Sequence, residues 1–335
     1  MSALDDRNAG GGGPVRGHRA RGCMITSSRG RPVSPRLGPS ASGQGGQLRV
    51  SPFVRALRPH QWAKNVLVFV PFIAAHQFLR VDLWLISIWT FVAFSLCASA
   101  IYVLNDIADI EADRAHPRKR TRPLAAGEIG VPAGLALAAG LLIASFATAI
   151  IGVSWQLALV IVVYCAITTA YSFALKREPV VDVFTLAGLY VLRIIAGGLS
   201  THTPLSSWLL GFALFFFLSL AFVKRYVELV AVDGQMAGRG YGPGDALWMH
   251  AVGTSAGYMA VLVLALYVNA AEVTVLYRRP QILWFLCPLL LFWLTRLWFR
   301  AGRGEVHDDP VIEALKDYAS YLLAAAATGV MLAAI

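Results

Sequence analysis

Residues 105–113 of the chain read NDIADIEAD and follow directly on an apolar run over residues 83–104. A run of that length can cross a bilayer as one helix, so we expect the carboxylates at the boundary between membrane and water. Asp106, Asp109 and Asp113 recur at i, i+3 and i+7, which places them on one face of a helix. Because like charges on one face repel each other, we expect a cation to hold them together.

The type of ligand indicates which cation this is. Carboxylate oxygens without His or Cys suit a hard divalent ion, and Mg²⁺ usually completes its shell with substrate phosphates. We therefore predict that Asp106, Asp109 and Asp113 are catalytic metal ligands for Mg²⁺, with Asn105 beside them as a substrate-binding residue. The alternative is the end of an amphipathic helix at the membrane surface, but carboxylates at membrane depth are costly and usually functional.

Five basic side chains follow this stretch within nine residues: Arg114, Arg118, Lys119, Arg120 and Arg122. Guanidinium and ammonium groups bind phosphate oxygens, so we predict that Arg118, Lys119 and Arg122 contact a phosphorylated substrate. The alternative is that the basic residues only orient the chain, since cytoplasmic loops of membrane proteins are rich in Lys and Arg.

Composition places the chain among polytopic membrane proteins. Of its 335 residues 57% are hydrophobic and 14% are charged, and the mean hydropathy is +0.61. Windows of about 20 apolar residues predict an all-α bundle of nine membrane-spanning helices. They cover approximately residues 64–80, 83–104, 131–151, 155–175, 180–199, 206–228, 249–270, 280–299 and 311–334.

The distribution of charge predicts orientation and partners. The formal net charge is +10, and Lys and Arg gather in the N-terminal tail and in the loops after the even-numbered spans. This pattern indicates a cytoplasmic side, anionic lipid and phosphorylated ligands, and no nucleic acid. We predict a multi-pass protein of the inner (plasma) membrane with a cytoplasmic active site. Homo-oligomerisation is left open.

The N-terminal region differs from the rest of the chain. Residues 1–50 are rich in Gly, Ser, Pro and Arg and lack the apolar centre of a signal peptide. We expect a disordered basic tail, followed by one catalytic transmembrane domain over residues 51–335. Four cysteines, Cys23, Cys97, Cys165 and Cys287, contain no CxxC pair, which indicates small core residues and neither a disulfide framework nor a zinc site.

A second group of polar residues surrounds the start of the fifth predicted span. It runs from Tyr171 through Lys176 to Asp182 and continues to Tyr190 and Arg193. Asp182 and Arg193 fall on one helix face, with Arg193 about three turns deeper in the membrane. A buried arginine needs an anionic partner, which is either a carboxylate of another helix or a ligand phosphate. We assign Asp182 to catalysis and the other four to substrate binding.

Basic residues at two further span ends complete the candidate site. Lys64 stands at the mouth of the first span, and Lys224 and Arg225 lie near the end of the sixth. We predict that all three bind substrate phosphate; the alternative is that Lys224 and Arg225 only extend toward the interface.

The loop before the last predicted span reads HDDP over residues 307–310. Asp309 before a proline is typical of a helix N-cap. His307 and Asp308 could support the site without touching the substrate.

Four blocks together carry a resemblance: RPHQWAKN at 58–65, NDIADIEAD at 105–113, YSFALKREPVVD at 171–182 and HDDP at 307–310. The acidic block resembles the Asp-rich motif of the UbiA superfamily of intramembrane prenyltransferases. The other three are similar to blocks of the decaprenyl-phosphate phosphoribosyltransferase family within that superfamily. The resemblance covers residues 51–335.

The resemblance implies a magnesium-dependent pentosyltransferase on a nine-helix bundle. A 5-phosphoribosyl group would pass from phosphoribosyl pyrophosphate (PRPP) to decaprenyl phosphate or another polyprenyl phosphate, and pyrophosphate would leave. The product, decaprenylphosphoryl-5-phosphoribose, implies a step toward the arabinan of cell-wall arabinogalactan and of lipoarabinomannan. In one respect the chain departs from the superfamily, whose members carry a second Asp-x-x-x-Asp motif. Here Glu178 and Asp182 stand with Lys176 and Arg177 beside them, which suits a donor with an extra 5-phosphate.

Two other functions compete with this hypothesis. A UbiA-type prenyltransferase would join a prenyl diphosphate to an aromatic acceptor, and Lys176 in place of a carboxylate argues against it. A secondary transporter of an anionic metabolite would use Asp106 and Arg193 as coupling and substrate sites. Transporters commonly contain internal repeats, and the sequence shows no convincing one.

Overall fold

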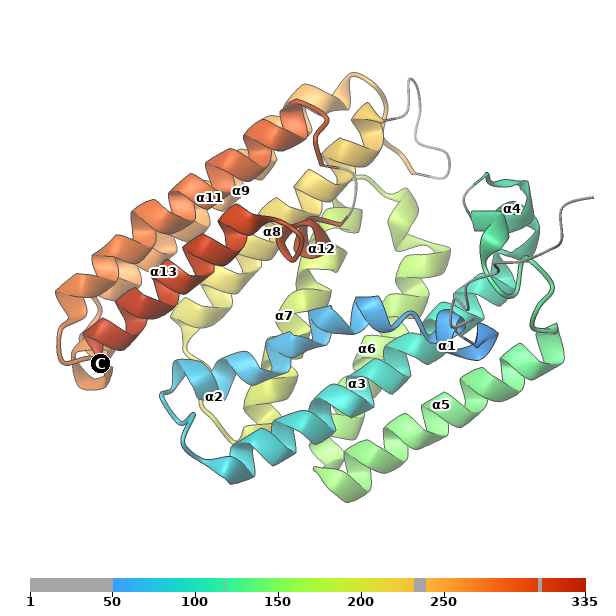
Figure 1. Cartoon of the computed structure of the whole chain (residues 1–335), viewed down its shortest axis with the longest axis horizontal. Coiled ribbons are helices and arrows are strands. Elements are labelled where there is room, and N and C mark those ends of the chain that lie inside the picture. Colours follow the sequence, from blue (N-terminus) through green and yellow to red (C-terminus); the bar gives the residue numbers. More distant parts are fainter. Residues whose placement is uncertain (1–50, 118, 232–238, 307–308) are drawn as a thin grey trace, which may run out of the picture. The chain divides into compact units, whose positions relative to one another are not determined.

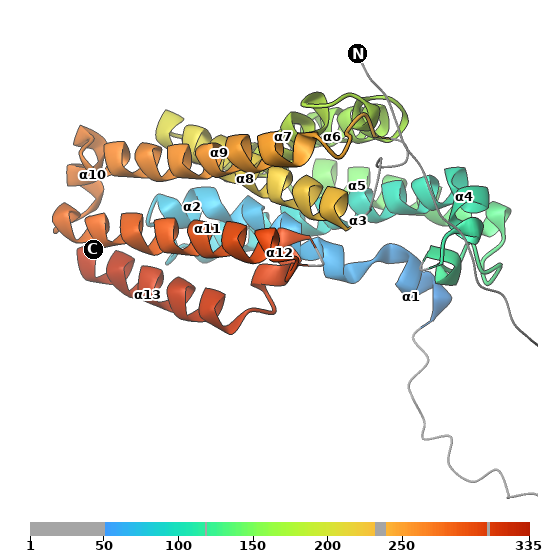
Figure 2. The ribbon, with the colours of Figure 1, turned by 90° about the horizontal axis from the view of Figure 1, so that it is seen from above.

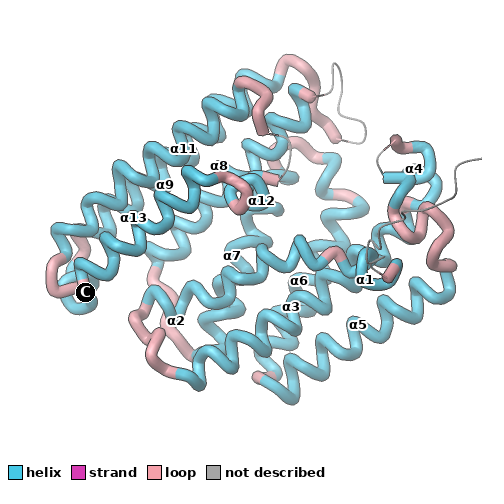
Figure 3. The backbone as a smooth tube through the Cα atoms, in the orientation of Figure 1, coloured by secondary structure: helices cyan, strands magenta, loops and turns pink. Residues whose placement is uncertain are grey.

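The computed structural model describes residues 51–117, 119–231, 239–306 and 309–335. The N-terminal tail, Arg118, His307 and Asp308 lie outside the described residues, so what we predict for them stays a prediction. The described residues form helices and connecting loops and contain no strand (Figure 3). The predicted class, an all-α membrane bundle, is confirmed.

Seven helices of the described residues are long and apolar enough to cross a membrane (Figure 1). They are α3 (Val81–Ala108), α5 (Val131–Gly152), α6 (Trp155–Phe173), α7 (Val181–Thr201), α8 (Ser207–Val230), α9 (Asp245–Val268), and η4 (Pro280–Phe285) continued by α11 (Leu286–Gly302). Each corresponds to one predicted span, because a helix of that length satisfies its own backbone hydrogen bonds inside a bilayer.

The first predicted span is not a regular α-helix. The chain forms a 3₁₀-helix, η1 (Pro59–Phe69), and then the short helix α2 (Val70–Ala74). Arg58 precedes η1 in the left-handed conformation, with φ of 52°. Pro71 lies in the first turn of α2 and cannot donate a backbone hydrogen bond. The predicted boundaries, 64–80, are therefore wrong for this segment.

The last predicted span, 311–334, is divided into α12 (Pro310–Ala314) and α13 (Tyr318–Ala334). Asp317 begins the second of these helices as its N-cap, since its carboxylate accepts from the Ser320 backbone N–H at 3.0 Å. The count of nine spans and their orientation stay predictions. Short helices join the longer ones: α1 (Pro52–Leu57), α4 (Ile110–Ala115), η2 (Lys119–Thr121), η3 (Leu175–Arg177) and α10 (Ala271–Leu276).

The helix α7 has packed neighbours on two sides, and the views in Figures 1 and 2 show other helices around it. Val183 and Ala187 belong to a buried cluster shared with α8, α9 and α11. Leu189 and Ala196 belong to another, shared with α3, α5 and α6. A polar side chain on α7 is therefore held among packed helices, and Arg193 is only 6% exposed.

A glycine lets η1 approach α7 closely. A Cβ atom at Gly197 would stand 2.1 Å from the carbonyl oxygen of Val68 on η1. This approach brings Asn65 on η1 into hydrogen-bonding contact with Arg193 on α7. The packing of a small residue thus sets the position of polar residues three to four positions away along both helices.

The described cysteines occupy packing positions, as predicted. Cys97 and Cys287 are buried, Cys165 is half-buried, and all three are free thiols. The sulfur atoms of Cys97 on α3 and Cys165 on α6 lie 3.2 Å apart.

Candidate active site

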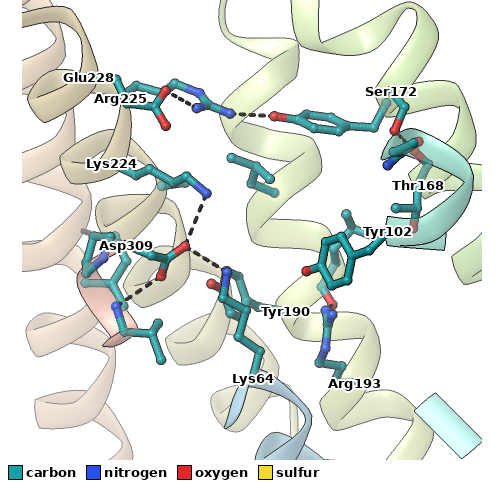
Figure 4. A pocket seen from close by; sticks show the side chains of 18 of the residues that line it. Lys64, Tyr102, Thr168, Ser172, Tyr190, Arg193, Lys224, Arg225, Glu228 and Asp309 are labelled. Atoms are coloured by element: carbon teal, nitrogen blue, oxygen red, sulfur yellow. Dashed lines mark hydrogen bonds and ion pairs between the residues drawn. The ribbon is translucent and has the colours of Figure 1, made fainter. Parts of the chain in front are cut away.

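A cavity of about 240 Å³ lies where η1, α3, α6, α7, α8 and the segment before α12 meet (Figure 4). Seven of the predicted substrate-binding residues line it: Lys64, Asn105, Tyr171, Tyr190, Arg193, Lys224 and Arg225. They come from five elements, and the residues on α3, α6 and α8 lie at the C-terminal parts of these helices. The structure thus gathers the ends that the charge pattern assigns to the cytoplasmic face.

The wall of the cavity is positively charged. Its described residues include five cationic side chains, with Arg239 as the fifth, and two carboxylates, Glu228 and Asp309. Among the residues that line the cavity, this is a formal excess of three positive charges. Such an arrangement favours an anionic ligand with several charges.

One group at this wall is neutral when the buried Asp182 behind the wall is counted, and we call it the Arg225 cluster: Arg225, Asp182, Glu228, Arg239 and Tyr171. Arg225 donates to both carboxylates and to the Tyr171 hydroxyl, and its Nη2 lies 2.9 Å from Asp182 Oδ1. Arg239 Nη1 lies 3.3 Å from Glu228 Oε2. Asp182 is fully buried and does not line the cavity. In this structure its carboxylate positions Arg225, and its predicted catalytic role stays a prediction.

A second part, the Asp309 cluster, joins three distant segments of the chain. Lys64 Nζ and Lys224 Nζ both donate to Asp309 Oδ2, at 2.8 and 3.2 Å (Figure 4). Asp309 Oδ1 accepts from the Val311 backbone N–H at 3.2 Å, so the predicted N-cap is confirmed. Burial alone would raise the pKa of Asp309, but the two lysines outweigh it and lower this pKa to about 2.

Arg193 is buried among neutral hydrogen-bond acceptors. Its Nε donates to Asn65 Oδ1 at 2.8 Å, its Nη2 donates to the Tyr164 hydroxyl at 3.0 Å, and its Nη1 donates to the Leu189 carbonyl. No carboxylate of the described residues lies within ion-pair distance of it. A buried charge without a counter-ion is costly. Of the two partners considered from the sequence, the geometry favours an anionic ligand.

Two of the cations lie close to the ring of Tyr190. Lys64 Nζ is 5.9 Å from the ring centre and Arg193 Cζ is 5.7 Å from it. The ring itself stacks on Phe217 at a centroid distance of 4.6 Å. These cation–π contacts orient both charges without neutralising them.

The acidic stretch does not run through one continuous helix, because α3 ends before Asp109 and α4 begins after it. Backbone hydrogen bonds from Asp109 to Asn105 and from Asp113 to Asp109 keep the chain close to helical. Asp106 is 3% exposed and Asp113 is 1% exposed, whereas Asp109 is exposed. None of the three lines the cavity, although Asn105 beside them does.

Two arginines pair with the buried carboxylates. Arg122 Nη1 lies 3.1 Å from Asp106 Oδ1 and 2.5 Å from Asp113 Oδ2, and Arg58 also donates to Asp106. Within the described ranges, no three His, Cys, Asp or Glu side chains are grouped to hold a metal. Two carboxylates nevertheless converge on one cationic group here. They fit Mg²⁺ in kind, since this ion is often held by one or two carboxylates together with substrate phosphates.

The remaining predicted residues lie away from the cavity wall. Lys119 is exposed, and Lys176 on η3 is half-buried. Arg122 contacts the acidic residues instead of the cavity. Arg118 lies outside the described residues.

Sequence reasoning missed several residues of the site. For Asp309 the sequence predicts a helix cap but no lysine partners. It also does not predict Asn65 and Tyr164 as partners of Arg193, or Arg58 as a partner of Asp106. Asn65 and Arg58 lie in the RPHQWAKN block, which was a signal. No signal connected Asp309 with Lys64, because the two residues are 245 positions apart.

Comparison with known proteins agrees with the fold. The model of the UbiA prenyltransferase family matches residues 66–311. Among solved structures, a UbiA homolog from Archaeoglobus fulgidus bound to GPP and Mg²⁺ has a TM-score of 0.62 and 19% identity. The match covers 84% of this chain and 99% of that one, and at this identity it shows the fold.

Three relatives differ in how much of their length the chain spans. Protein y4nM of Sinorhizobium fredii is 40% identical over 82% of this chain and 54% of its own length. Nodulation protein NoeC of Azorhizobium caulinodans is 34% identical over 80% of this chain and 88% of its own. Decaprenyl-phosphate phosphoribosyltransferase of Mycobacterium tuberculosis is 44% identical over 54% of this chain and 61% of its own. The chain thus spans little more than half the length of the first and third of these proteins.

The family match begins inside η1 and ends inside α12, and it includes every described residue that lines the cavity except Lys64. Together with the bundle of apolar helices, it identifies an integral membrane protein. The chain belongs to the UbiA prenyltransferase family.

Proposed function

We propose that the protein transfers a 5-phosphoribosyl group from PRPP to a polyprenyl phosphate and releases pyrophosphate. The observation that carries this proposal is the positively charged cavity, in which Arg193 has no carboxylate partner among the described residues. The similarity to decaprenyl-phosphate phosphoribosyltransferases supports the choice of donor and acceptor.

Donor and acceptor phosphates are held by different groups in this proposal. The donor diphosphate lies at the end of α3, against Asn105 and close to Asp106 and Asp113. The acceptor phosphate lies deeper, against Arg193 and Lys224. Because these two residues project from apolar spanning helices, a lipid phosphate held there can keep its hydrocarbon chain in the membrane.

The reaction requires no proton transfer from the protein. An oxygen of the acceptor phosphate attacks C1 of the ribose, the bond from C1 to the diphosphate oxygen breaks, and the diphosphate keeps the electron pair. The acceptor phosphate is ionised at neutral pH, so no general base is needed. The described cavity wall accordingly offers lysines, arginines and tyrosines for positioning and charge stabilisation.

Mg²⁺ would be held by Asp106 and Asp113, and Asp109 stays a predicted ligand. When bound, the ion would neutralise charge that develops on the leaving diphosphate. Asn105, on the cavity wall next to Asp106, is placed to donate to a diphosphate oxygen.

The test uses purified protein in nanodiscs with Mg²⁺ and two substrate pairs. With PRPP and decaprenyl phosphate we expect pyrophosphate release and a lipid product whose mass has increased by one phosphoribosyl group. With a prenyl diphosphate and an aromatic acid we expect no product. The reverse outcome would establish the prenyltransferase alternative. Flux of an anionic metabolite into sealed proteoliposomes without chemical conversion would establish the transporter.

Location and pathway follow from the same proposal. We place the active site at the cytoplasmic face of the plasma membrane, as the charge pattern predicts. The use of the product for cell-wall arabinan stays a prediction from the resemblance.

A further inference from the structure

We call the part of the cavity around Lys64, Lys224 and Arg193 its deep end. One carboxylate, that of Asp309, is within reach of two of these cations. Lys64 and Lys224 share Asp309 Oδ2, at 2.8 and 3.2 Å. Among the described residues no carboxylate pairs with Arg193, whose guanidinium faces the same ring of Tyr190 as Lys64 does (Figure 4). This group of four residues therefore has a formal charge of +2.

The rest of the cavity wall does not change this charge. Within the Arg225 cluster, Arg225 and Arg239 are balanced by Asp182 and Glu228. A ligand phosphate that replaces solvent at the deep end is therefore matched by the +2 group alone. Buried charges are stable only when they are closely balanced.

A phosphate monoester fits this balance better than a diphosphate. At neutral pH a monoester carries a charge of about −1.5 to −2. A diphosphate ester has one more ionised group and about one more negative charge. Without Asp309 the deep end would have a charge of +3 and would suit the diphosphate.

The geometry of Asp309 exceeds what an N-cap requires. One oxygen is sufficient to cap a helix, and Asn serves as well as Asp. Asp309 uses Oδ1 for the cap of α12 and leaves Oδ2 to the two lysines. Its side chain is 9% exposed, so water screens these ion pairs little.

We propose that Asp309 is a specificity-determining residue, which makes the deep end of the cavity select a lipid phosphomonoester over a lipid diphosphate. This inference rests on the proposed function, in which the deep end holds the acceptor phosphate. It also accounts for how a member of a prenyltransferase family could exclude prenyl diphosphates from an otherwise cationic cavity.

The experiment measures dissociation constants of farnesyl phosphate and farnesyl diphosphate by isothermal titration calorimetry. The protein is full-length and in detergent, and EDTA removes any contribution from divalent ions. The wild type should bind the monophosphate more tightly. Asp309→Asn keeps a capping side chain and removes the charge, so the ratio of the two constants should shift by about tenfold or more toward the diphosphate.

Asp317→Asn is the matched control, because Asp317 also caps a helix and pairs with an arginine but does not line the cavity. Its ratio should equal that of the wild type. Lys224→Gln lowers the charge of the deep end and should shift the ratio in the opposite direction, toward the monophosphate. This second variant keeps the proposal testable if Asp309→Asn does not fold.

An unchanged ratio in Asp309→Asn, even if both ligands bind more weakly, would overturn the inference and leave Asp309 with a purely structural role. So would a shift of the Lys224→Gln ratio toward the diphosphate. Failure of the proposed function has a different result. If the ratio shifts as expected but PRPP yields no lipid product, the selectivity stands and the donor assignment fails.

Discussion

Replacing Arg193 by Gln is a direct test of the buried cation in the cavity. Its guanidinium donates to three neutral groups, Asn65 Oδ1, the Tyr164 hydroxyl and the Leu189 carbonyl. A glutamine amide can keep part of this hydrogen bonding while it removes the charge. We therefore expect the variant to fold and to bind the acceptor phosphate more weakly.

The size of the effect follows from the type of contact that is lost. A hydrogen bond to a charged group contributes about 1.5–3 kcal/mol, which corresponds to a loss of about 10- to 150-fold in kcat/KM for the polyprenyl phosphate. Stability should change little. Loss of hydrogen bonds to Arg193 destabilises the empty protein, whereas removal of a buried charge without a counter-ion stabilises it.

The assay measures kcat/KM for decaprenyl phosphate at saturating PRPP, with thermal unfolding of the same samples. Arg279→Gln is the matched control, because Arg279 is exposed and lies in the connection before η4, away from the cavity wall. We expect it to retain wild-type kcat/KM. Equal losses in the two variants, or wild-type kcat/KM in Arg193→Gln, would refute the role of Arg193 in phosphate binding.

Three further predictions concern the metal, the acidic residue before α12 and the packing of η1. Asp106→Asn should abolish turnover, and it should also abolish Mn²⁺ binding measured by electron paramagnetic resonance. EDTA should abolish turnover of the wild type, whereas Asp82→Asn at the other end of α3 should retain both turnover and Mn²⁺ binding. Tight Mn²⁺ binding by Asp106→Asn would remove the metal assignment. The pKa of Asp309 is lowered from 3.8 to about 2, so its ion pairs are fully present above pH 3.8 and are lost as the pH falls toward 2. Titration of Asp309 should therefore cause no change in farnesyl phosphate binding between about pH 5 and 8. A loss of binding on acidification within this range that disappears in Asp309→Asn would contradict the lowered pKa. Gly197→Ala should lower stability by about 1–3 kcal/mol, because its Cβ would stand 2.1 Å from a backbone carbonyl of η1. Gly188→Ala on the same helix is the control, because its Cβ would meet nothing within 4 Å. Equal thermal midpoints of the two variants would show that η1 can move away at no cost.

The long helices could be predicted from apolar length because each satisfies its backbone hydrogen bonds within itself. That argument fails where a single residue interrupts the series of backbone hydrogen bonds. Pro71 lies in the first turn of α2, directly after η1, and Asp317 caps α13 within a stretch that is apolar enough to predict one continuous helix. Helix interruptions of this kind depend on single residues, whereas a window of about 20 residues measures only an average hydropathy.

The site was predictable where its residues are close in sequence and not where packing brings them together. Helix spacing placed Asp106 and Asp113 near each other, and both are within reach of Arg122. The contact of Asn65 with Arg193 spans 128 positions and depends on how η1 packs against α7. No spacing rule contains that information, so the partners of the buried arginine could only be stated as alternatives.

The central claim is that the cavity joins a ribosyl donor to a lipid phosphate, and transfer of label tests it most directly. Purified protein in liposomes is given PRPP labelled in the ribose, Mg²⁺ and decaprenyl phosphate, and label is counted in the organic extract. The account predicts labelled lipid that depends on both the lipid phosphate and the cation, in amounts equal to the pyrophosphate released. Pyrophosphate release without labelled lipid, or labelled lipid formed equally well by Asp106→Asn, would contradict it.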